Sequence, residues 1–271
     1  MTGQGSEGRV AVLGHRGMLG SVVARVLRSR GHAVDVVGLR YRGGADDPFI
    51  EQLQALAPST IVNCLGVVST SLGRPEQLMA ANGLLPQHVA AVLPAARLIH
   101  ASTDCVFDGK RGWYSVDEPP NSVDAYGLSK RIGEACVRDG AIVLRTSIVG
   151  PPGGGGRGLL GWFLGQQGSV DGWVDHRWNG ITTLEWALLA ADIIDGTVDL
   201  GPGVHHPTTV DTLSKFDMLH LFAEAYDRRI DILQVRTGSA CDRTLAPTLP
   251  MPPLLDQLRA LRAWESAGGR R

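Results

Sequence analysis

A glycine-rich loop that directly follows a short apolar run constrains the fold of this chain more than any other feature. Residues 9–13 read as a short buried strand, residues 14–20 follow the pattern G-x-x-G-x-x-G, and an apolar-periodic helix comes next. In such a unit the glycines permit a tight turn, let backbone approach a pyrophosphate, and allow helix and strand to pack closely. The loop therefore predicts dinucleotide binding in preference to an ordinary glycine-rich turn. The candidate cofactor contacts in it are Gly14, Arg16, Gly17, Met18 and Leu19.

Short apolar runs alternate with helix-like segments over the first 150 residues. The runs lie at residues 10–13, 33–38, 60–65, 97–102 and 141–145. This order predicts an α/β fold, with a Rossmann-like, doubly wound parallel sheet and right-handed crossovers. Gly31 follows the periodic segment 19–30 and suits the position just after the end of the first helix. Ligands should bind outside the carboxyl ends of the strands.

The pattern of alternating apolar runs and helix-like segments ends at Gly150. Residues 151–156 are two prolines and four glycines, which predicts a mobile loop, and the segments beyond are helical patches broken by Pro and Gly. We predict a disordered lead-in at 1–8 and a dinucleotide-binding domain at 9–150. Residues 151–271 should form mainly a small substrate-binding lobe, with some segments returning to the first domain. A chain of 271 residues can bury the core that this needs.

Composition argues against several classes of protein. The net charge is -1 and the basic residues are scattered, so nucleic-acid binding is not expected. No apolar stretch is long enough to span a bilayer, and the N-terminus lacks an apolar signal segment, so we expect no membrane association and a cytoplasmic location. Without a C-x-x-C pair or a histidine at ligand spacing, no metal site is predicted. The sequence does not set the oligomeric state, and a homodimer is one option.

The residues that follow the second and third expected strands bear on the cofactor. An acid after the second strand would hydrogen-bond the ribose of NAD, whereas arginine would accept the 2′-phosphate of NADP. That strand is followed by Arg40 and Arg42 and by no acid, which favours NADPH, with NADH as the alternative. Leu65 ends the third apolar run, and Gly66 follows it. A glycine here would let the strand approach the cofactor, and a plain turn glycine is an equal interpretation.

Tyr126 and Lys130 form a Tyr-x-x-x-Lys pair that predicts acid-base chemistry. Residues four apart share one face of a helix, so the ammonium can lie close to the phenol. A fixed cation would lower the phenol pKa from its usual value of about 10 and would suit the group to proton transfer. On its own this spacing also occurs by chance on exposed helices.

A third candidate group is a hydroxyl at the end of the fourth apolar run. Ser102 and Thr103 stand where a parallel sheet binds its ligands, and either could hold a carbonyl oxygen while Tyr126 protonates it. Either could equally be a strand-end cap. The residues alone leave both alternatives open.

Several segments, taken in order, resemble the extended short-chain dehydrogenases/reductases, and most closely their dTDP-4-dehydrorhamnose reductase group. They are the loop at 14–20, Ser-Thr-Asp-Cys-Val-Phe-Asp-Gly at 102–109, Tyr-Gly-Leu-Ser-Lys at 126–130, Gly-Glu at 133–134 and Leu-Arg-Thr-Ser at 144–147. The segments at 178–185 and 241–245 are also similar to that group.

The resemblance implies reduction of a keto group, at C4, of a nucleotide-linked deoxysugar with hydride from NADPH. By position, Thr103 matches the catalytic hydroxyl, Tyr126 the proton donor, and Lys130 the residue that binds the nicotinamide ribose and lowers the tyrosine pKa. Asn82 matches an asparagine that begins the helix lining the cofactor side. The substrate contacts that we expect are Thr103, Asp104, Cys105, Trp178 and Arg243.

Departures from the family leave alternatives open. Dehydratases of the superfamily carry Asp-Glu after the threonine, and the sequence Asp104-Cys105 disfavours dehydration. Rhamnose-pathway reductases usually have Tyr in place of Cys105, so the sugar pocket should differ. A sugar-nucleotide epimerase and a non-catalytic dinucleotide-binding regulatory subunit are the other interpretations. One of Trp162, Trp173 or Trp178 is a candidate for base stacking, and Arg243 could bind the diphosphate or form a surface ion pair.

Overall fold

A computed structural model describes residues 8–44, 46–68, 74–151 and 158–268 of the chain. Residues 1–7 of the expected lead-in lie outside the described residues, as do the glycines at 153–156 in the expected mobile loop.

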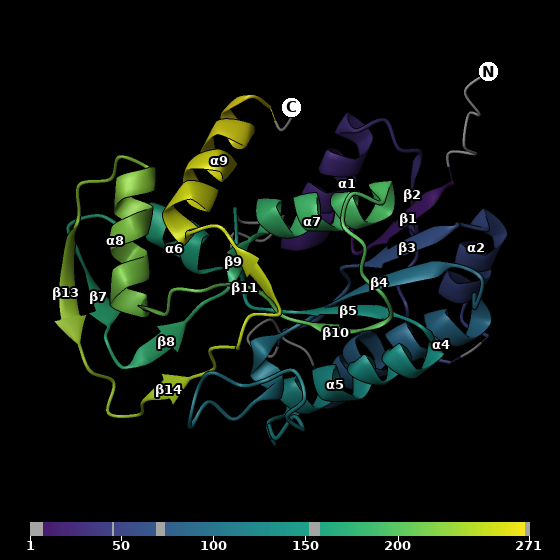
Figure 1. Cartoon of the computed structure of the whole chain (residues 1–271), viewed down its shortest axis with the longest axis horizontal. Helices are drawn as coiled ribbons and strands as arrows, with labels where there is room; N and C mark the ends of the chain where they lie inside the picture. Colours follow the sequence, from purple (N-terminus) through teal and green to yellow (C-terminus); the bar gives the residue numbers. More distant parts are fainter. Residues whose placement is uncertain (1–7, 45, 69–73, 152–157, 269–271) are drawn as a thin grey trace.

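The centre of the molecule is a six-stranded parallel sheet (Figure 1). Its strands in spatial order are β10 (Gly203–His205), β5 (Ile142–Arg145), β4 (Arg97–Ser102), β3 (Thr60–Asn63), β1 (Val10–Leu13) and β2 (Val34–Val36). Every neighbouring pair is parallel. Strand order reverses beside β1, as in a doubly wound sheet, so the predicted fold class is confirmed.

The alternation of residues along β1 shows why both faces of this sheet are covered. Val10 and Val12 pack into a cluster with helices α1 (Met18–Ser29), α7 (Thr183–Asp195) and α9 (Leu254–Ser266), whereas Ala11 and Leu13 pack into a second cluster on the opposite face. Successive side chains of a strand point to opposite faces, so this short apolar run supplies both layers. The second cluster includes residues of α2 (Pro48–Leu56) and α4 (Leu85–Val92).

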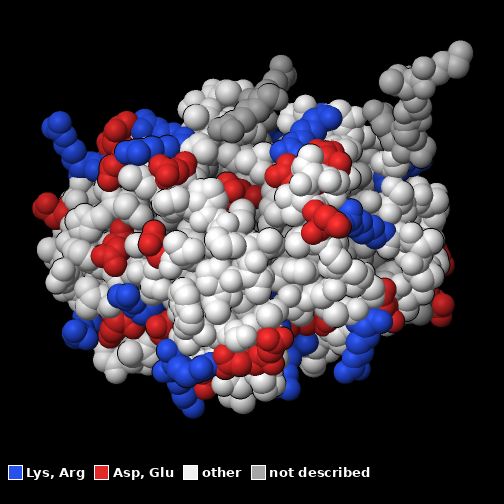
Figure 2. All heavy atoms as spheres, viewed as in Figure 1, with Lys and Arg blue, Asp and Glu red and all other residues white. Residues whose placement is uncertain are grey.

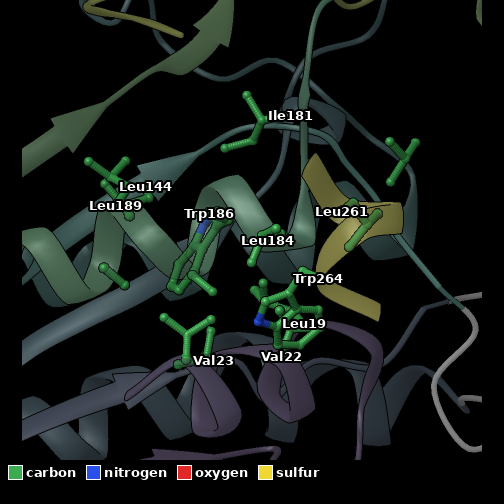
Figure 3. Packing of buried hydrophobic residues seen from close by; sticks show 14 of the residues in the cluster. Leu19, Val22, Val23, Leu144, Ile181, Leu184, Trp186, Leu189, Leu261 and Trp264 are labelled. Atoms are coloured by element: carbon green, nitrogen blue, oxygen red, sulfur yellow. The ribbon is translucent and has the colours of Figure 1, made fainter. Parts of the chain in front are cut away.

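The larger cluster joins segments that are far apart in the sequence (Figure 3). Val22 and Val23 of α1 face Leu184 and Trp186 of α7, and Trp264 of α9 closes the same cluster. Trp186 and Trp264 are almost completely buried. Because α7 lies beyond residue 150, a segment of the second half of the chain completes the first layer, as β10 completes the sheet.

The first helix ends where the sequence predicts. Arg30 caps α1 and Gly31 follows with φ +89°, a left-handed conformation that favours glycine. The amide of Gly31 donates to the Arg28 carbonyl (3.1 Å) and that of His32 to the Leu27 carbonyl (3.1 Å), which is a Schellman motif.

The remaining elements complete the domain around the central sheet and form a smaller lobe. Short helices in the first half are α3 (Pro75–Leu78), the π-helical turn η2 (Met79–Leu84), η3 (Asp104–Val106), α5 (Ala125–Gly133) and η4 (Glu134–Asp139). The second half adds β6 (Ile148–Val149), α6 (Leu159–Leu164), β7 (Ser169–Trp173), β8 (His176–Trp178), β9 (Ile181–Thr182), β11 (Pro207–Thr209), β12 (Leu213–Ser214), α8 (Lys215–Ala225), β13 (Asp231–Val235), β14 (Cys241–Asp242) and β15 (Leu249–Met251).

The small C-terminal lobe is built from strand pairs distant in sequence. β7 pairs with β13, and β8 pairs with β12 on one side and β14 on the other. Together with α6 and α8 these strands lie beside the end of the central sheet (Figure 1). On the face drawn in Figure 2, acidic and basic side chains are interspersed. Within the described residues, no helix has the length and apolar character needed to cross a membrane.

Candidate active site

The glycine loop folds into a turn that only glycine fits. Gly14 has φ +78°, and a Cβ there would lie 2.8 Å from backbone atoms of Leu65. A Cβ on Gly20 would lie 2.2 Å from the Gly14 carbonyl oxygen, so this glycine lets α1 pack against the turn. Gly17 caps α1 without a side-chain hydrogen bond, and the first turn of the helix has no acid. The helix N-terminus thus presents free amide dipoles suited to an anion.

Two neighbouring cavities lie along this turn and the ends of the strands. One, of about 310 Å³, is lined by residues of the glycine turn that include Gly14, Arg16 and Gly17. The other, of about 530 Å³, is lined in part by Arg42 and Gln77. Both are lined by Arg40, Leu65 and Gly66, so the two spaces adjoin at the carboxyl ends of β2 and β3.

The expected arginines do not belong to the second strand itself. β2 ends at Val36, earlier than the expected 38, and Arg40 and Arg42 stand in the segment that follows. Met18 and Leu19 line neither cavity, and the side chain of Leu19 is buried in the core. A contact from Leu19 to a ligand would have to come from its backbone.

Asn82 is placed differently from the prediction. It does not begin a helix but lies inside η2, fully buried. Its Oδ1 accepts from the Val67 amide (2.9 Å), and its Nδ2 donates to the Val67 carbonyl (2.9 Å) and to Ser129 Oγ (3.0 Å). Asn82 therefore ties the loop after β3 to α5. The expected contact between Asn82 and a cofactor stays a prediction.

Tyr126 and Lys130 lie on α5, as predicted. Asp124 caps this helix by accepting a hydrogen bond from the Gly127 amide (2.9 Å), which starts the helix just before Tyr126. Lys130 is 6% exposed, and its Nζ donates to the Ala101 carbonyl of β4 (3.1 Å). A Cβ on Gly66 would lie 3.2 Å from the same Nζ. The ammonium therefore lies between β4 and the rim of the cavities.

The pKa of Tyr126 is shifted in the direction opposite to the one predicted. Burial raises the pKa of the Tyr126 phenol, and Cys105 adds to the rise, whereas the contact with the Thr103 hydroxyl opposes it. Burial also lowers the pKa of Lys130 to about 8. Desolvation is the largest cause of the rise in the Tyr126 pKa, so Tyr126 retains its proton at neutral pH.

The structure separates the two candidate hydroxyls. Ser102 donates to Glu134 Oε1 (2.6 Å) and points into a buried polar network. Thr103 accepts from the Cys105 amide (3.2 Å), donates to Asp104 Oδ1 (3.0 Å) and contacts Tyr126. Thr103 is thus the hydroxyl that lies beside the phenol, whereas Ser102, the last residue of β4, points away from it.

The network behind Ser102 was not found by sequence reasoning. Arg145 binds Glu134 through Nε (2.8 Å) and Nη2 (2.7 Å), and its Nη1 lies 3.1 Å from His206 Nε2. His206 Nδ1 lies 3.1 Å from the Ala246 carbonyl, so the neutral tautomer with the proton on Nδ1 satisfies both contacts. Burial and the nearby Arg145 lower the pKa of His206 to about 4. His206 lies between β10 and β11.

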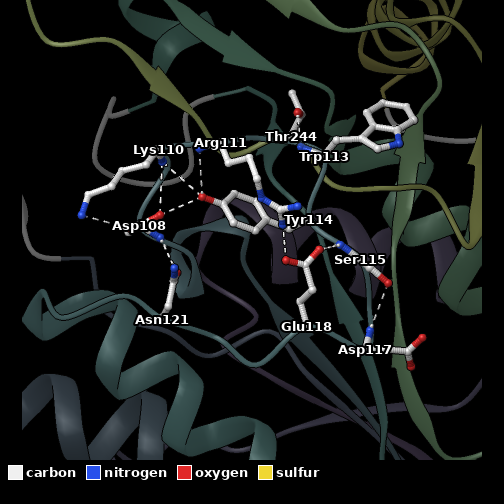
Figure 4. Close-up of polar contacts among 10 residues, drawn as sticks. All are labelled: Asp108, Lys110, Arg111, Trp113, Tyr114, Ser115, Asp117, Glu118, Asn121 and Thr244. Carbon is white, nitrogen blue, oxygen red and sulfur yellow. Dashed lines mark hydrogen bonds and ion pairs between the residues drawn. The ribbon is translucent and has the colours of Figure 1, made fainter.

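A loop after η3 connects the turn at residues 103–106, which contains Thr103, to the C-terminal lobe (Figure 4). Tyr114 Oη donates to Asp108 Oδ1 (2.7 Å), and its ring stacks on Phe107 with centroids 4.2 Å apart. The Trp113 amide donates to Thr244 Oγ1 of the lobe (2.9 Å). The Arg243 Nε donates to the Phe107 carbonyl (2.9 Å), which holds the guanidinium next to the end of η3.

Trp178, an expected substrate contact, is placed in the core. It is 3% exposed and belongs to the larger apolar cluster, so its ring offers no surface to a nucleotide base. The Nζ of Lys215 lies 5.7 Å from its ring centroid. Trp162 and Trp173 are about half exposed, at 43% and 44%.

Comparison with known proteins agrees with the fold. The RmlD substrate binding domain family model matches residues 8–231. A probable low-salt glycan biosynthesis reductase of Haloferax volcanii is 36% identical over 157 residues, which cover 51% of this chain and only about half, 52%, of that protein. The dTDP-4-dehydrorhamnose reductase of Mycolicibacterium smegmatis is 28% identical over 80% of this chain and 69% of its own length.

A solved structure supports the same fold. The dTDP-4-dehydrorhamnose reductase of Bacillus anthracis, determined in complex with NADP, superimposes with a TM-score of 0.82 over 94% of this chain and 99% of that chain, at 19% identity. Because the family model covers more than half of the sequence, the chain belongs to the RmlD substrate binding domain family, and the predicted dTDP-4-dehydrorhamnose reductase-like character is confirmed.

Proposed function

We propose that this protein reduces the C4 keto group of a nucleotide-diphosphate-linked deoxysugar with NADPH. The observation that carries the proposal is the contact between Thr103 and Tyr126 just after the end of β4. The Lys130 ammonium lies between that strand and Gly66, which lines both cavities. In a doubly wound sheet this edge is where ligands bind.

Each of the three residues has a role that its surroundings support. Tyr126 retains its proton at neutral pH, so it can give that proton to the carbonyl oxygen as negative charge develops there. Thr103 exchanges its hydrogen bond to Asp104 for one to the same oxygen and holds it in place. Lys130 supplies a buried ammonium beside Gly66 at the rim of the cavities, with donors for ribose hydroxyls. Bound NADPH would supply the hydride.

The cofactor cradle fits a dinucleotide. The Gly14 turn leaves no room for a Cβ, and the acid-free N-terminus of α1 suits a pyrophosphate. Arg40 lines both cavities and Arg42 lines one, and these two cations suit a 2′-phosphate. Gly14, Arg16, Gly17, Leu65 and Gly66 are the further contacts proposed for this cradle.

Replacing Arg40 and Arg42 together with alanine should weaken NADPH binding about 10- to 100-fold, the scale of a lost charged hydrogen bond. NADH lacks the 2′-phosphate, so its dissociation constant should change much less. Both constants can be measured by fluorescence titration of the reduced cofactors. Arg131→Ala, which removes an exposed arginine of α5, is the control. Equal losses for the two cofactors would mean that the 2′-phosphate is bound elsewhere.

In this proposal the two halves of the chain bind different ligands. Residues 9–150 bind the cofactor, and residues 151–271 mainly bind the substrate, while β10 and α7 return to the first domain. Asp104, Cys105 and Arg243 are the proposed substrate contacts. Trp178 is not among them, because its ring is buried and cannot stack on a nucleotide base.

The decisive experiment is cofactor oxidation with freshly generated dTDP- and UDP-linked 4-keto-6-deoxyhexoses, with NADPH and NADH in parallel. Oxidation that depends on the keto sugar supports the reductase. NAD that remains bound through purification would favour the epimerase instead. Tight NADPH binding without turnover on any keto sugar would favour a regulatory subunit.

A further inference from the structure

One face of α5 contacts the end of β4 at three points. Tyr126, Lys130 and Glu134 follow one another at intervals of four, so they lie along one side of the helix and its C-cap. All three contact residues 101–103, which are the last two residues of β4 and the residue after them. The proposed function uses the contacts of Tyr126 and Lys130. The contact of Glu134 has no role in it.

The end of β4 is held by the sheet on one side only. Its pairing with β3 ends at His100, opposite Asn63, whereas its pairing with β5 continues to Ser102, opposite Arg145. Thr103 follows both pairings and is the N-cap of η3. The position of the Thr103 hydroxyl therefore depends on what holds the residue before it.

A buried carboxylate holds Ser102. Ser102 Oγ donates to Glu134 Oε1 (2.6 Å), and both residues are buried. Arg145 binds the same carboxylate, from Nε to Oε1 (2.8 Å) and from Nη2 to Oε2 (2.7 Å). Because the strand pairing places Ser102 beside Arg145, the two side chains reach Glu134 from the same face of the sheet. Ser102 thus donates to an acceptor that a charged fork keeps in place.

Arg145 is itself held by two other segments. Its Cζ lies 5.2 Å from the centroid of the Phe107 ring, just after η3. Its Nη1 lies 3.1 Å from His206 Nε2, between β10 and β11. A shift of the Glu134 carboxylate would therefore disturb contacts to both segments as well as the hydrogen bond to Ser102.

Building on the proposed function, we propose that Ser102 is a positioning residue that sets the approach of the Thr103 hydroxyl to Tyr126. Its hydrogen bond to Glu134 ties the strand that leads to Thr103 to the helix that carries Tyr126. The Ser102 hydroxyl is directed at Glu134, so it acts through Thr103 and not on the substrate carbonyl. That carbonyl oxygen has to meet both hydroxyls at once, and a misplacement of about 1 Å can cost on the order of 10²-fold in rate.

Ser102→Ala removes this hydrogen bond, while Glu134 keeps both of its bonds to Arg145. We expect kcat to fall about tenfold, with KM for the keto sugar and the NADPH dissociation constant nearly unchanged, because the ligand contacts remain. Ser102→Thr retains a hydroxyl and should keep most of the wild-type kcat. The control is Ser29→Ala, which removes a serine hydroxyl that donates to the Val26 carbonyl (2.8 Å) near the end of α1.

A double-mutant cycle separates positioning from a general loss of structure. Thr103→Val keeps the shape of the residue and removes its hydroxyl. If Ser102 acts through that hydroxyl, adding Ser102→Ala to Thr103→Val should leave kcat unchanged. An equal loss in both backgrounds, or a wild-type kcat in a folded Ser102→Ala protein, overturns the proposal. If Ser102→Ala does not bind NADPH and so has not folded, Ser102→Cys, whose thiol is a weak donor, is measured in the same way.

A measurement without substrate separates this proposal from the proposed function. In protein labelled with 3-fluorotyrosine, the fluorine resonance that is missing in Tyr126→Phe belongs to Tyr126. Ser102→Ala should shift this resonance, because the contact with Thr103 changes, and Ser29→Ala should not. A shifted resonance in a protein that reduces no keto sugar would retain the positioning role and remove the reductase. Turnover of a keto sugar, with kcat and the resonance both unchanged in Ser102→Ala, would remove the positioning role and leave the reductase standing.

Discussion

Tyr126→Phe should lower turnover by a factor of about 10² to 10⁴, the usual worth of a positioned general acid, with NADPH binding nearly unchanged. The variant keeps the ring and removes only the hydroxyl, so α5 and its contacts should persist. Burial raises the pKa of this phenol, so the residue is protonated at neutral pH and can act as the proton donor. Single-turnover oxidation of NADPH with a saturating keto sugar measures the loss directly.

A matched control for this variant is Tyr226→Phe. Tyr226 is also a tyrosine whose pKa is raised by burial, but its hydroxyl donates to Glu265 Oε2 (3.1 Å), away from the cavities. Turnover in Tyr226→Phe should match the wild type. Turnover in Tyr126→Phe close to the wild-type rate would show that another group donates the proton.

Local patterns in the sequence predict the parts of the site that depend on local geometry. The pair Tyr126 and Lys130 needs only one helix, and the Gly14 turn needs only one strand-turn-helix unit, so spacing alone places them. The strands β1 and β4 begin and end as predicted, because each is a continuous apolar run between clear boundaries. β2 is shorter than predicted, because the chain leaves the sheet after Val36 to line the cavity.

Contacts between distant segments could not be predicted in this way. The sixth strand, β10, joins β5 from about sixty residues away, and no periodicity within either segment indicates that pairing. Trp178 was expected to face substrate because it is aromatic, but α8 covers it with Lys215. The rise in the pKa of Tyr126 could not be predicted for the same reason, since burial and the nearby Cys105 cause it.

Arg145→Met should destabilise the fold by about 3 to 5 kcal/mol, the cost of leaving one partner of a buried ion pair uncompensated. Arg145 and Glu134 have side chains that are only 3% and 7% exposed, and they are joined by two hydrogen bonds of 2.8 and 2.7 Å. For a domain of this size the melting temperature should fall by roughly 6 to 20 °C. Urea unfolding followed by far-UV circular dichroism measures the change.

The remaining carboxylate is the physical cause of this large expected loss, so neutralising it should restore stability. Adding Glu134→Gln to Arg145→Met removes the uncompensated charge while keeping acceptor and donor atoms near Ser102, and the double variant should recover a substantial part of the free energy. The exposed pair of Arg9 and Asp35 is the control, because solvent screens this ion pair and Arg9→Met should therefore cost far less stability than Arg145→Met. If Arg145→Met is no less stable than Arg9→Met, or the double variant is less stable than either single variant, the network does not hold the end of β4 in the way that its geometry indicates.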